Sequence, residues 1–482
     1  MNTKKWILFL LTLCIAAALS VSVSAAEIST DAVSGEWTYS LSYGEATITG
    51  YSGSSTSVTV PSTLDGYTVV GIGSYVFDDC YRIKSVTFPK TLQTIGSGAF
   101  RNCRGLTEIT LPESLTSLGY DAFYDCYNLK KITVHSKNLS CNSSGDTFSN
   151  SGKNAANGIE VIFSNSVTVI PAYIFDCDND SYARITSVKI GKNVKSIGQH
   201  AFYNCADLKT VDIGRYMKLD TIEQYAFRNC TSLTNMTIPS WVTNIGYCAF
   251  ENCSSMFRLD VLNPTCKFYS NKNTLGVPGK TVIYGYKGTS AETYANKYGY
   301  VFQAISIPFS DVSVSDYYLN PTMWAVDNGI TNGTSSTTFS PLNACERCQV
   351  VTFLWRAVGC PELEFVFYPL FIDIKSSDYF YKPVVWAVKQ NITTGTDSMH
   401  FSPYTICNRA AVVTFLWRAA GCPEPVATST PFIDVKSTDF FYKPVLWAVE
   451  EGITNGIDAT HFGPDAACNR AQVVTFLYRA YN

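Results

Sequence analysis

A unit of about 23 residues recurs along the first part of the chain, and it limits the possible folds more than any other feature. Each copy approximates the pattern Ile-Gly-x-x-Ala-Phe-x-x-Cys-x-x-Leu-x-x-Ile-x-Ile-Pro. A degenerate eighth copy, centred on Phe148, fills the long interval before Phe175. Units of this size bury their apolar face only against their neighbours, so the repeats predict a solenoid. The phenylalanines of the seven clear copies are Phe77, Phe100, Phe123, Phe175, Phe202, Phe227 and Phe250.

The internal pattern of the unit predicts how one turn is built. The segment Leu-x-x-Ile-x-Ile indicates a strand whose apolar residues point inward and whose intervening residues point outward. The Ala-Phe pair is expected in a short helical or irregular return segment that packs on the strand. The glycine ahead of it is expected to allow a tight corner.

The 17 cysteines allow two interpretations. An exported protein with many cysteines often carries a disulfide framework. However, seven cysteines occupy one position of the repeat, three residues after a phenylalanine, and a free cysteine behaves as a small buried hydrophobe. We favour unpaired core cysteines and leave disulfides as the alternative. The seven are Cys80, Cys103, Cys126, Cys177, Cys205, Cys230 and Cys253.

The outward strand positions line the face that a solenoid commonly uses for binding. They carry threonine, lysine and aspartate, and neither an aromatic cluster nor a patch of one charge marks a ligand. Simple solvated β-positions are therefore an equal alternative. The positions are Thr87, Thr110, Thr133, Lys189, Asp212, Thr237 and Asp260.

The repeated unit resembles the leucine-rich repeats of the BspA-like type, which occur on bacterial and some protist surfaces. The resemblance covers residues 45 to about 305 and implies a leucine-rich-repeat β-solenoid with short strands and irregular or helical returns. We predict an N-terminal cap and first turn at 27–72, the repeats at 73–280, and a C-terminal cap at 281–304.

A second, longer unit occurs three times in the last third of the chain, at a period of 61 to 62 residues. Each copy contains Phe-x-Asp followed by Val or Ile, an aromatic run, Trp-Ala-Val, a turn that ends in glycine, and an arginine that opens a second apolar segment. The pattern predicts two helices per copy. The first helix is expected to begin at Pro321, Pro383 or Pro444 and to end at Gly329, Asn391 or Gly452.

The second helix of each copy is expected after a Phe-(Ser/Gly)-Pro segment. In the third copy Asn469 and Gln472 have the spacing of a capping box. The cysteine ahead of each cap would then belong to a hydrophobic staple, which explains Cys345, Cys407 and Cys468 without disulfides.

This triplicated segment resembles the S-layer homology (SLH) domain, whose hallmark is Thr-Arg-Ala-Glu. The resemblance implies an all-α, three-lobed bundle with SLH copies at 305–366, 367–427 and 428–482. It also implies non-covalent binding to a secondary cell-wall polysaccharide, which is often pyruvylated. The chain departs from the hallmark, because Gln349, Ala411 and Gln472 replace the glutamate.

Four residue types recur in the copies and are the candidate contacts to the wall polymer. The arginine would lie in the first turn of a helix, and its planar fork fits a carboxylate. The tryptophan offers an apolar face to a sugar, the glycine allows close backbone approach, and the aspartate accepts sugar hydroxyls or orients the arginine. Core packing is the alternative for the tryptophans, and a turn or cap role for the aspartates. The candidates are Asp311, Trp324, Gly333 and Arg347 in copy one, Asp373, Trp386, Gly395 and Arg409 in copy two, and Asp434, Trp447, Gly456 and Arg470 in copy three.

Copy one is the most divergent of the three. Glu346 stands where the other copies have asparagine, and it adds negative charge beside Arg347. Among the three arginines, Arg347 is therefore expected to bind an anionic polymer least well.

The N-terminus predicts export. Lys4 and Lys5 precede an apolar run from Trp6 to Leu19. The segment Val23-Ser24-Ala25-Ala26 supplies small residues for a cleavage site, so residues 1–26 fit a secretory signal peptide. A membrane anchor is the alternative, but the run is shorter than the ~20 residues a spanning helix needs. We expect an exported, wall-associated protein without a membrane span after cleavage.

Composition argues against several functional classes. A net charge of -3 gives no support for nucleic-acid binding. The four histidines are scattered, and we find no nucleophile motif, metal cluster or phosphate loop, so we expect no enzyme, metal or cofactor. Two hypotheses remain: a non-catalytic surface protein whose solenoid binds a protein or glycan ligand, and a structural S-layer-associated spacer without a specific ligand.

Overall fold

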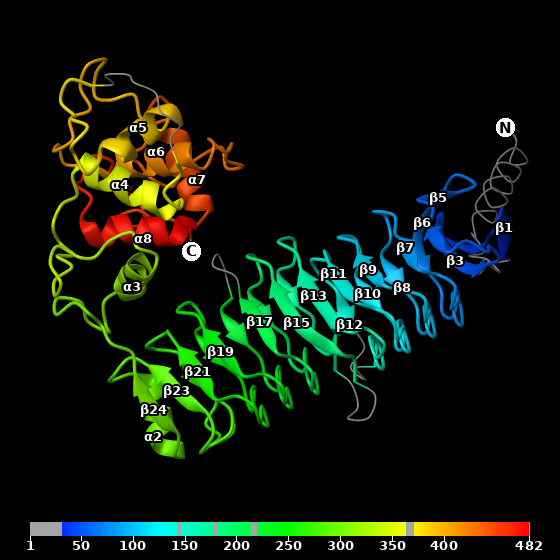
Figure 1. The fold of residues 1–482 in the computed structure, drawn as a ribbon. Coiled ribbons are helices and arrows are strands. Elements are labelled where there is room, and N and C mark those ends of the chain that lie inside the picture. Colours follow the sequence, from blue (N-terminus) through cyan, green and yellow to red (C-terminus); the bar gives the residue numbers. More distant parts are fainter. Residues whose placement is uncertain (1–30, 142–145, 177–181, 214–218, 363–370, 482) are drawn as a thin grey trace, which may run out of the picture.

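The computed structural model describes residues 31–141, 146–176, 182–213, 219–362 and 371–481 (Figure 1). The predicted signal peptide and Cys177 lie outside these residues. An elongated solenoid leads into a helical module, and the module lies beside the C-terminal end of the solenoid (Figure 1).

The solenoid consists of short strands and one helix. Their bounds are β1 (Ala32–Ser34), β2 (Trp37–Ser42), β3 (Glu45–Tyr51), β4 (Ser57–Thr59), β5 (Thr63–Leu64), β6 (Tyr67–Ile72), β7 (Ser85–Thr87), β8 (Thr94–Ile95), β9 (Glu108–Leu111), β10 (Ser117–Leu118), β11 (Lys131–Val134), β12 (Ser140–Cys141), β13 (Ile159–Phe163), β14 (Val169–Ile170), β15 (Ile185–Ile190), β16 (Ser196–Ile197), β17 (Thr210–Ile213), β18 (Thr221–Ile222), β19 (Asn235–Ile238), β20 (Asn244–Ile245), β21 (Arg258–Val261), β22 (Lys267–Phe268), β23 (Val282–Gly285), α2 (Ser290–Tyr298) and β24 (Val301–Ala304).

Two faces of the solenoid carry parallel ladders, because most turns contribute one longer strand and one two-residue strand. The longer strands pair in the orders β17-β15-β13-β11-β9-β7-β4 and β19-β21-β23-β24. The second ladder begins at the six-residue strand β6 and continues through two-residue strands, in the orders β6-β8-β10-β12 and β14-β16-β18-β20-β22. The ladder of longer strands gives about 11 turns, because β4 at one end and β23 and β24 at the other extend the eight units recognised in the sequence. The alternation of buried and exposed residues along β9 confirms the predicted strand pattern.

A column of phenylalanine rings forms the centre of the solenoid. Phe100 and Phe123 stack with centroids 5.3 Å apart and an interplanar angle of 3°, and Phe123 and Phe148 stack at 5.0 Å and 6°. The degenerate copy therefore supplies its ring to the same column. At the N-terminal end, Trp37 and Tyr51 cover Phe77, from the antiparallel strands β2 and β3.

The glycine of each repeat is required for a reason other than the tight corner that we expected. A Cβ on Gly119 would lie 2.3 Å from the backbone nitrogen of Ser97, and one on Gly246 would lie 2.4 Å from that of Gln224. The glycines therefore allow one turn to approach the backbone of the preceding turn. Left-handed conformations occur elsewhere in the return segment, for example at Asn229 with φ 62°.

The cysteine column is confirmed for the part of the chain that the structure describes, where no cysteine forms a disulfide. The thiol of Cys230 donates to the carbonyl of Phe202 at 3.3 Å, and that of Cys253 donates to the carbonyl of Phe227 at 3.1 Å. Burial raises the pKa of Cys253 to about 12. These thiols serve the packing of neighbouring turns, and their burial makes them poor nucleophiles.

Thiol labelling of the folded chain checks this arrangement. We expect Cys360 and Cys422, the exposed cysteines of the described residues, to react rapidly with a colorimetric thiol reagent. The buried column should react only after denaturation, because its thiols are inaccessible and protonated. The variant Cys360→Ser/Cys422→Ser should lose the rapid phase. Rapid labelling of Cys230 or Cys253 in the folded protein would contradict the model of a closed solenoid core.

The helical module contains two helices from each sequence copy. The first helices are α3 (Leu319–Asp327), α5 (Tyr381–Lys389) and α7 (Tyr442–Glu450), and the second helices are α4 (Arg347–Ala357), α6 (Arg409–Ala419) and α8 (Arg470–Tyr481). The second helices contact one another at the centre. Each first helix packs on the second helix of another copy: α5 on α4, α7 on α6, and α3 on α8. The last pair joins the two ends of the module and closes it into a ring.

Three backbone hydrogen bonds mark the centre of this ring. Cys345 N donates to Cys468 O at 2.9 Å, Cys407 N to Cys345 O at 2.8 Å, and Cys468 N to Cys407 O at 2.9 Å. The three residues are buried, with free thiols. The hydrophobic-staple interpretation did not anticipate that these cysteines join the three copies.

The helix boundaries correct one prediction and confirm two others. Each first helix begins two residues before the expected proline, which still lies in the first turn, where its missing N–H removes no helical bond. Gly329 at the C-terminal end has the expected left-handed conformation, with φ 66°. The capping box is present: Asn469 N donates to Gln472 Oε1 at 3.1 Å, and Gln472 N donates to Asn469 Oδ1 at 2.9 Å.

One residue of α8 connects the module to the solenoid. The hydroxyl of Tyr478 forms a hydrogen bond with Ser240 Oγ at 2.5 Å, and its ring centroid lies 6.2 Å from that of Trp241. The equivalent positions of the other two copies are Trp355 and Trp417, which donate to carbonyls within the module.

Candidate functional site

The three candidate arginines occupy the first position of the second helices and make equivalent hydrogen bonds. Arg409 Nε donates to Phe462 O at 2.9 Å, and its Nη2 donates to Thr454 Oγ1 at 3.2 Å. The Nη1 group has no acceptor among the described residues. The equivalent acceptors are Phe339 O at 2.8 Å and Thr331 Oγ1 at 3.2 Å for Arg470, and Phe401 O at 3.1 Å and Thr393 Oγ1 at 3.4 Å for Arg347.

Each guanidinium group also lies near the faces of two phenylalanine rings. For Arg409 the distances from Cζ to the ring centroids are 5.0 Å for Phe462 and 5.2 Å for Phe476. Such contacts favour a cation and hold its plane in one orientation. The equivalent pairs are Phe339 and Phe353 around Arg470, and Phe401 and Phe415 around Arg347.

These arginines are buried without a carboxylate in salt-bridge contact. Arg409 is 3% exposed and Arg470 is 5% exposed, whereas Arg347 is half-buried. Burial lowers the pKa of Arg409, and Asp434 is too distant for an ion pair but acts in the opposite direction. A buried charge is costly unless it is paired, so an incoming anion would gain from each of these sites. The arginines that form ion pairs in the described part of the chain are Arg101, Arg184, Arg228 and Arg258.

The structure groups these residues differently from the sequence prediction. Each arginine was expected to act with the aspartate, tryptophan and glycine of its own copy. Instead, the loop it contacts belongs to another copy, because the second helices insert between copies. The Arg409 site contains Asp434, Thr454 and Phe462, the Arg470 site contains Asp311, Thr331 and Phe339, and the Arg347 site contains Asp373, Thr393 and Phe401.

The aspartates hold the loops that receive the arginines. Phe462 N donates to Asp434 Oδ1 and Gly463 N donates to Asp434 Oδ2, both at 2.8 Å. Asp311 and Asp373 bind the equivalent pairs of backbone N–H groups. Both oxygens of each carboxylate are therefore used within the protein, which favours the turn role over direct contact with a ligand.

The glycines and tryptophans also have structural roles. Gly456 has φ 84°, and a Cβ there would lie 2.5 Å from His461 O and 2.6 Å from the Phe432 ring. The absence of a side chain at Gly456 therefore lets other atoms of the same copy come close, and not a ligand. Gly333 and Gly395 are in equivalent positions. Trp386 and Trp447 are buried in the module core, as their core interpretation requires. Trp324 is half-buried and packs edge-on against Tyr478 at 5.7 Å.

Glu346 is the N-cap of α4, directly ahead of Arg347, as the sequence placed it. It lies beside Cys348, whose thiol donates to Glu346 Oε2 at 3.6 Å, and it raises the pKa of Tyr379. Burial, Cys407 and Asp373 are the influences on the pKa of Arg347. The Arg347 site also differs from the other two in its greater exposure and its longer bond to Thr393.

Sequence reasoning missed several members of these sites. The threonines occur in the Ile-Thr turns, and the phenylalanines occur in the Phe-(Ser/Gly)-Pro and Val-Thr-Phe-Leu segments. The repetition of these segments was visible, but nothing in it indicated that their side chains meet an arginine. The missed threonines are Thr331, Thr393 and Thr454.

The outward positions of the solenoid form a regular but mixed surface. Thr110 pairs with Thr133, and Lys189 pairs with Asp212 on the next strand. Lys189 forms an ion pair with Glu160 at 2.8 Å. The outward positions therefore combine hydroxyl groups with charges of both signs, as solvated β-positions do.

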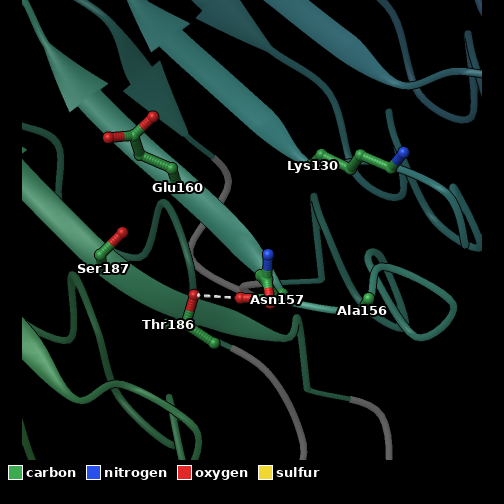
Figure 2. A pocket seen from close by; sticks show the side chains of 7 residues that line it. Lys130, Ala156, Asn157, Glu160, Thr186 and Ser187 are labelled. Atoms are coloured by element: carbon green, nitrogen blue, oxygen red, sulfur yellow. Dashed lines mark hydrogen bonds between the residues drawn. The ribbon is translucent and has the colours of Figure 1, made fainter.

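A hollow of about 340 Å³ lies at the start of β13 and β15, next to the register shift after Ile159 (Figure 2). Figure 2 shows Thr186 donating to the carbonyl of Asn157, at 2.7 Å. The lining contains the positive charge of Lys130 and the negative charge of Glu160. The hollow therefore favours neither anionic nor cationic ligands.

Family models match two regions of the chain. The model described as BspA type leucine rich repeat region matches six copies, at residues 70–180 and 149–271. The model of the S-layer homology domain matches residues 308–348 and 431–474. The middle copy of the triplicate lies outside these matches, so the expected count of three rests on the repeated sequence and the equivalent contacts.

Similar proteins match parts of the chain. An endoglucanase of Bacillus sp. (strain KSM-635) is 31% identical over 111 residues, which are 23% of this chain and 12% of that protein. The chain thus spans about an eighth of the length of that relative. A leucine-rich repeat protein of T. pallidum is 19% identical, with a TM-score of 0.33, over 57% of this chain and 100% of that chain. A leucine-rich cell surface protein of Faecalibacterium prausnitzii is 18% identical, with a TM-score of 0.22, over 59% and 97%.

Proposed function

We propose that this chain, which carries BspA-type leucine-rich repeats and S-layer homology domains, is a non-catalytic surface protein held non-covalently on a secondary cell-wall polysaccharide. The helical module is the anchor, and the solenoid is displayed for binding to a protein or glycan. Export through the N-terminal signal peptide completes this proposal.

The observation that carries the proposal is the buried, unpaired state of Arg409 and Arg470. A guanidinium fork with two hydrogen bonds already used and Nη1 unused suits a carboxylate, which arrives as an acid sugar or a pyruvyl ketal. The phenylalanines around each cation exclude water and strengthen its interaction with an anion. The loops whose backbone N–H groups bind the aspartates preorganise the site in the absence of a ligand.

Binding of purified wall polysaccharide by the exported chain tests the anchor. The variant Arg409→Ala/Arg470→Ala is expected to bind at least about 100-fold more weakly, because it removes two charged hydrogen-bond donors. The variant Arg409→Lys/Arg470→Lys should bind at an intermediate level, since it keeps the charge but loses the fork.

The matched control is Lys375→Ala/Lys436→Ala, which removes two exposed positive charges from the same module. It should bind as the wild type does, and circular dichroism should show that all variants keep their helices. Wild-type affinity in the Arg409→Ala/Arg470→Ala variant would refute these arginines as the binding site.

The alternative is a structural spacer without a specific ligand, and the paired charges on the outward face favour it. Ordered self-assembly of the full chain, together with no signal on arrays of glycans and matrix proteins, would support the spacer. A saturable ligand that is lost when outward residues such as Thr110 and Asp212 are changed would support display.

A further inference from the structure

An exposed aromatic residue precedes each first helix of the module. Tyr317 is 62% exposed, Tyr379 is 61% exposed and Phe440 is 70% exposed. Each ring stands nearly perpendicular to the aromatic ring that follows it, at a centroid distance of 5.1 Å in all three copies. The orientation of these rings is therefore fixed by the fold, although most of their surface faces solvent.

The packing of the helices places each aromatic residue beside one arginine site. Tyr317 leads into α3, which packs on α8, and α8 carries the Phe476 ring that holds Arg409. In the same way Tyr379 leads into α5, which packs on α4, and the Phe353 ring of α4 holds Arg470. Phe440 leads into α7, which packs on α6, where the Phe415 ring holds Arg347. Each site thus receives residues from all three copies.

The hydroxyl of Tyr379 lies 3.4 Å from the thiol of Cys348 in the first turn of α4, and Arg470 N donates to Asn343 O just ahead of that helix. Burial raises the pKa of Tyr317, whereas Arg479 and Arg409 lower it. By equivalence with Tyr379, Tyr317 is expected to lie over the first turn of α8, and Arg409 N donates to Ala466 O just ahead of that helix. Burial also raises the pKa of Tyr379, and Tyr379 in turn acts on the pKa of Arg470.

The three sites differ in what this position offers. The hydroxyl of Tyr317 has no partner among the described residues and is free to bind a ligand. The hydroxyl of Tyr379 is held by the thiol of Cys348 at 3.4 Å, with Glu346 beside it. Phe440 has no hydroxyl. The residues equivalent to Cys348 are Ala410 and Ala471, so the thiol is specific to this site.

We propose that Tyr317 is a specificity-determining contact that makes the Arg409 site the principal site for a carboxylate-bearing sugar. Its hydroxyl donates to the carboxylate beside Arg409, and its exposed ring covers the sugar ring. The Arg470 site is weaker because Cys348 and Glu346 occupy the hydroxyl of Tyr379, and the Arg347 site is weaker because Phe440 offers no donor. This inference rests on the proposed wall-polymer function.

Calorimetric titration of the exported chain with a methyl hexopyranoside that carries a pyruvyl ketal tests the assignment. We expect one tight class of site in the wild type. Tyr317→Phe should weaken that class at least about tenfold, since it removes one hydrogen bond to a charged group. Cys348→Ala and Phe440→Tyr, which copy the sequence of the other sites, should each strengthen a second site.

The outcomes separate this inference from the anchor itself. Tyr317→Phe with wild-type affinity, or three equal sites in the wild type, would overturn the role of Tyr317 while the arginine variants still test the anchor. Tyr317 is exposed and its substitution removes one oxygen, so a folding defect is not expected, and thermal denaturation checks this. Absence of binding by the wild type to both the ketal and wall polysaccharide would overturn both proposals.

Discussion

Removal of residues 470–482, which form α8 and the C-terminal residue, is expected to unfold the whole helical module and not the third copy alone. The helix packs on α3 of the first copy and on the central helices α4 and α6. Its buried side chains Val473, Val474, Phe476 and Leu477 each contribute about 1.5–3 kcal/mol of burial. Their sum is comparable with the total stability of a typical domain, about 5–15 kcal/mol.

Circular dichroism at 222 nm and thermal denaturation measure this effect. The matched control is removal of residues 480–482, which keeps these four side chains and the other buried residues of α8. The control should retain a cooperative transition of the module, whereas the full deletion should abolish it. If the full deletion loses only one third of the helical signal and the rest still melts cooperatively, the ring closure through α3 and α8 is wrong.

Substitution of one ring in the phenylalanine column is expected to have the second large effect. Phe227→Ala removes a fully buried ring that stacks on Phe202 at 5.2 Å and on Phe250 at 5.4 Å. The expected loss in the free energy of unfolding is about 3–5 kcal/mol, because neighbouring turns cannot close the cavity. Denaturant titration gives the size of the loss, and hydrogen exchange should locate it in the turns next to Phe227.

The matched control is Phe257→Ala, which truncates a phenylalanine of the same solenoid that is 58% exposed. Its effect should stay below about 1 kcal/mol, as for most surface substitutions. Equal effects at the two positions would show that the column does not carry the stability of the solenoid.

The solenoid was predictable because its unit repeats local geometry. The period places Phe148 in the column even though the rest of its copy is degenerate, and the stacked rings confirm it. The role of the repeated glycines was harder to predict from the sequence. A glycine required by a neighbouring backbone, as at Gly119, has the same sequence signal as one required by a tight corner.

The arginine sites were only partly predictable, for a geometric reason. Three similar copies give the same periodic pattern whether Arg470 meets the loop of its own copy or that of the first copy. The hydrogen bond from Arg470 to Phe339 joins residues 131 positions apart, and only the closure of the ring brings them together. Repetition also marks supporting and ligand-facing residues alike, so Asp434 could not be assigned to the loop until its two N–H donors were known.

The contact between Tyr478 and Ser240 has a mechanical consequence for a chain held through its helical module, as we propose for this one. The chain enters the module just before α3, and α3 lies against α8, which itself touches the solenoid through Tyr478. A tensile load on the solenoid therefore reaches the first and last helices together. The first copy is therefore not expected to separate from the module before the third copy.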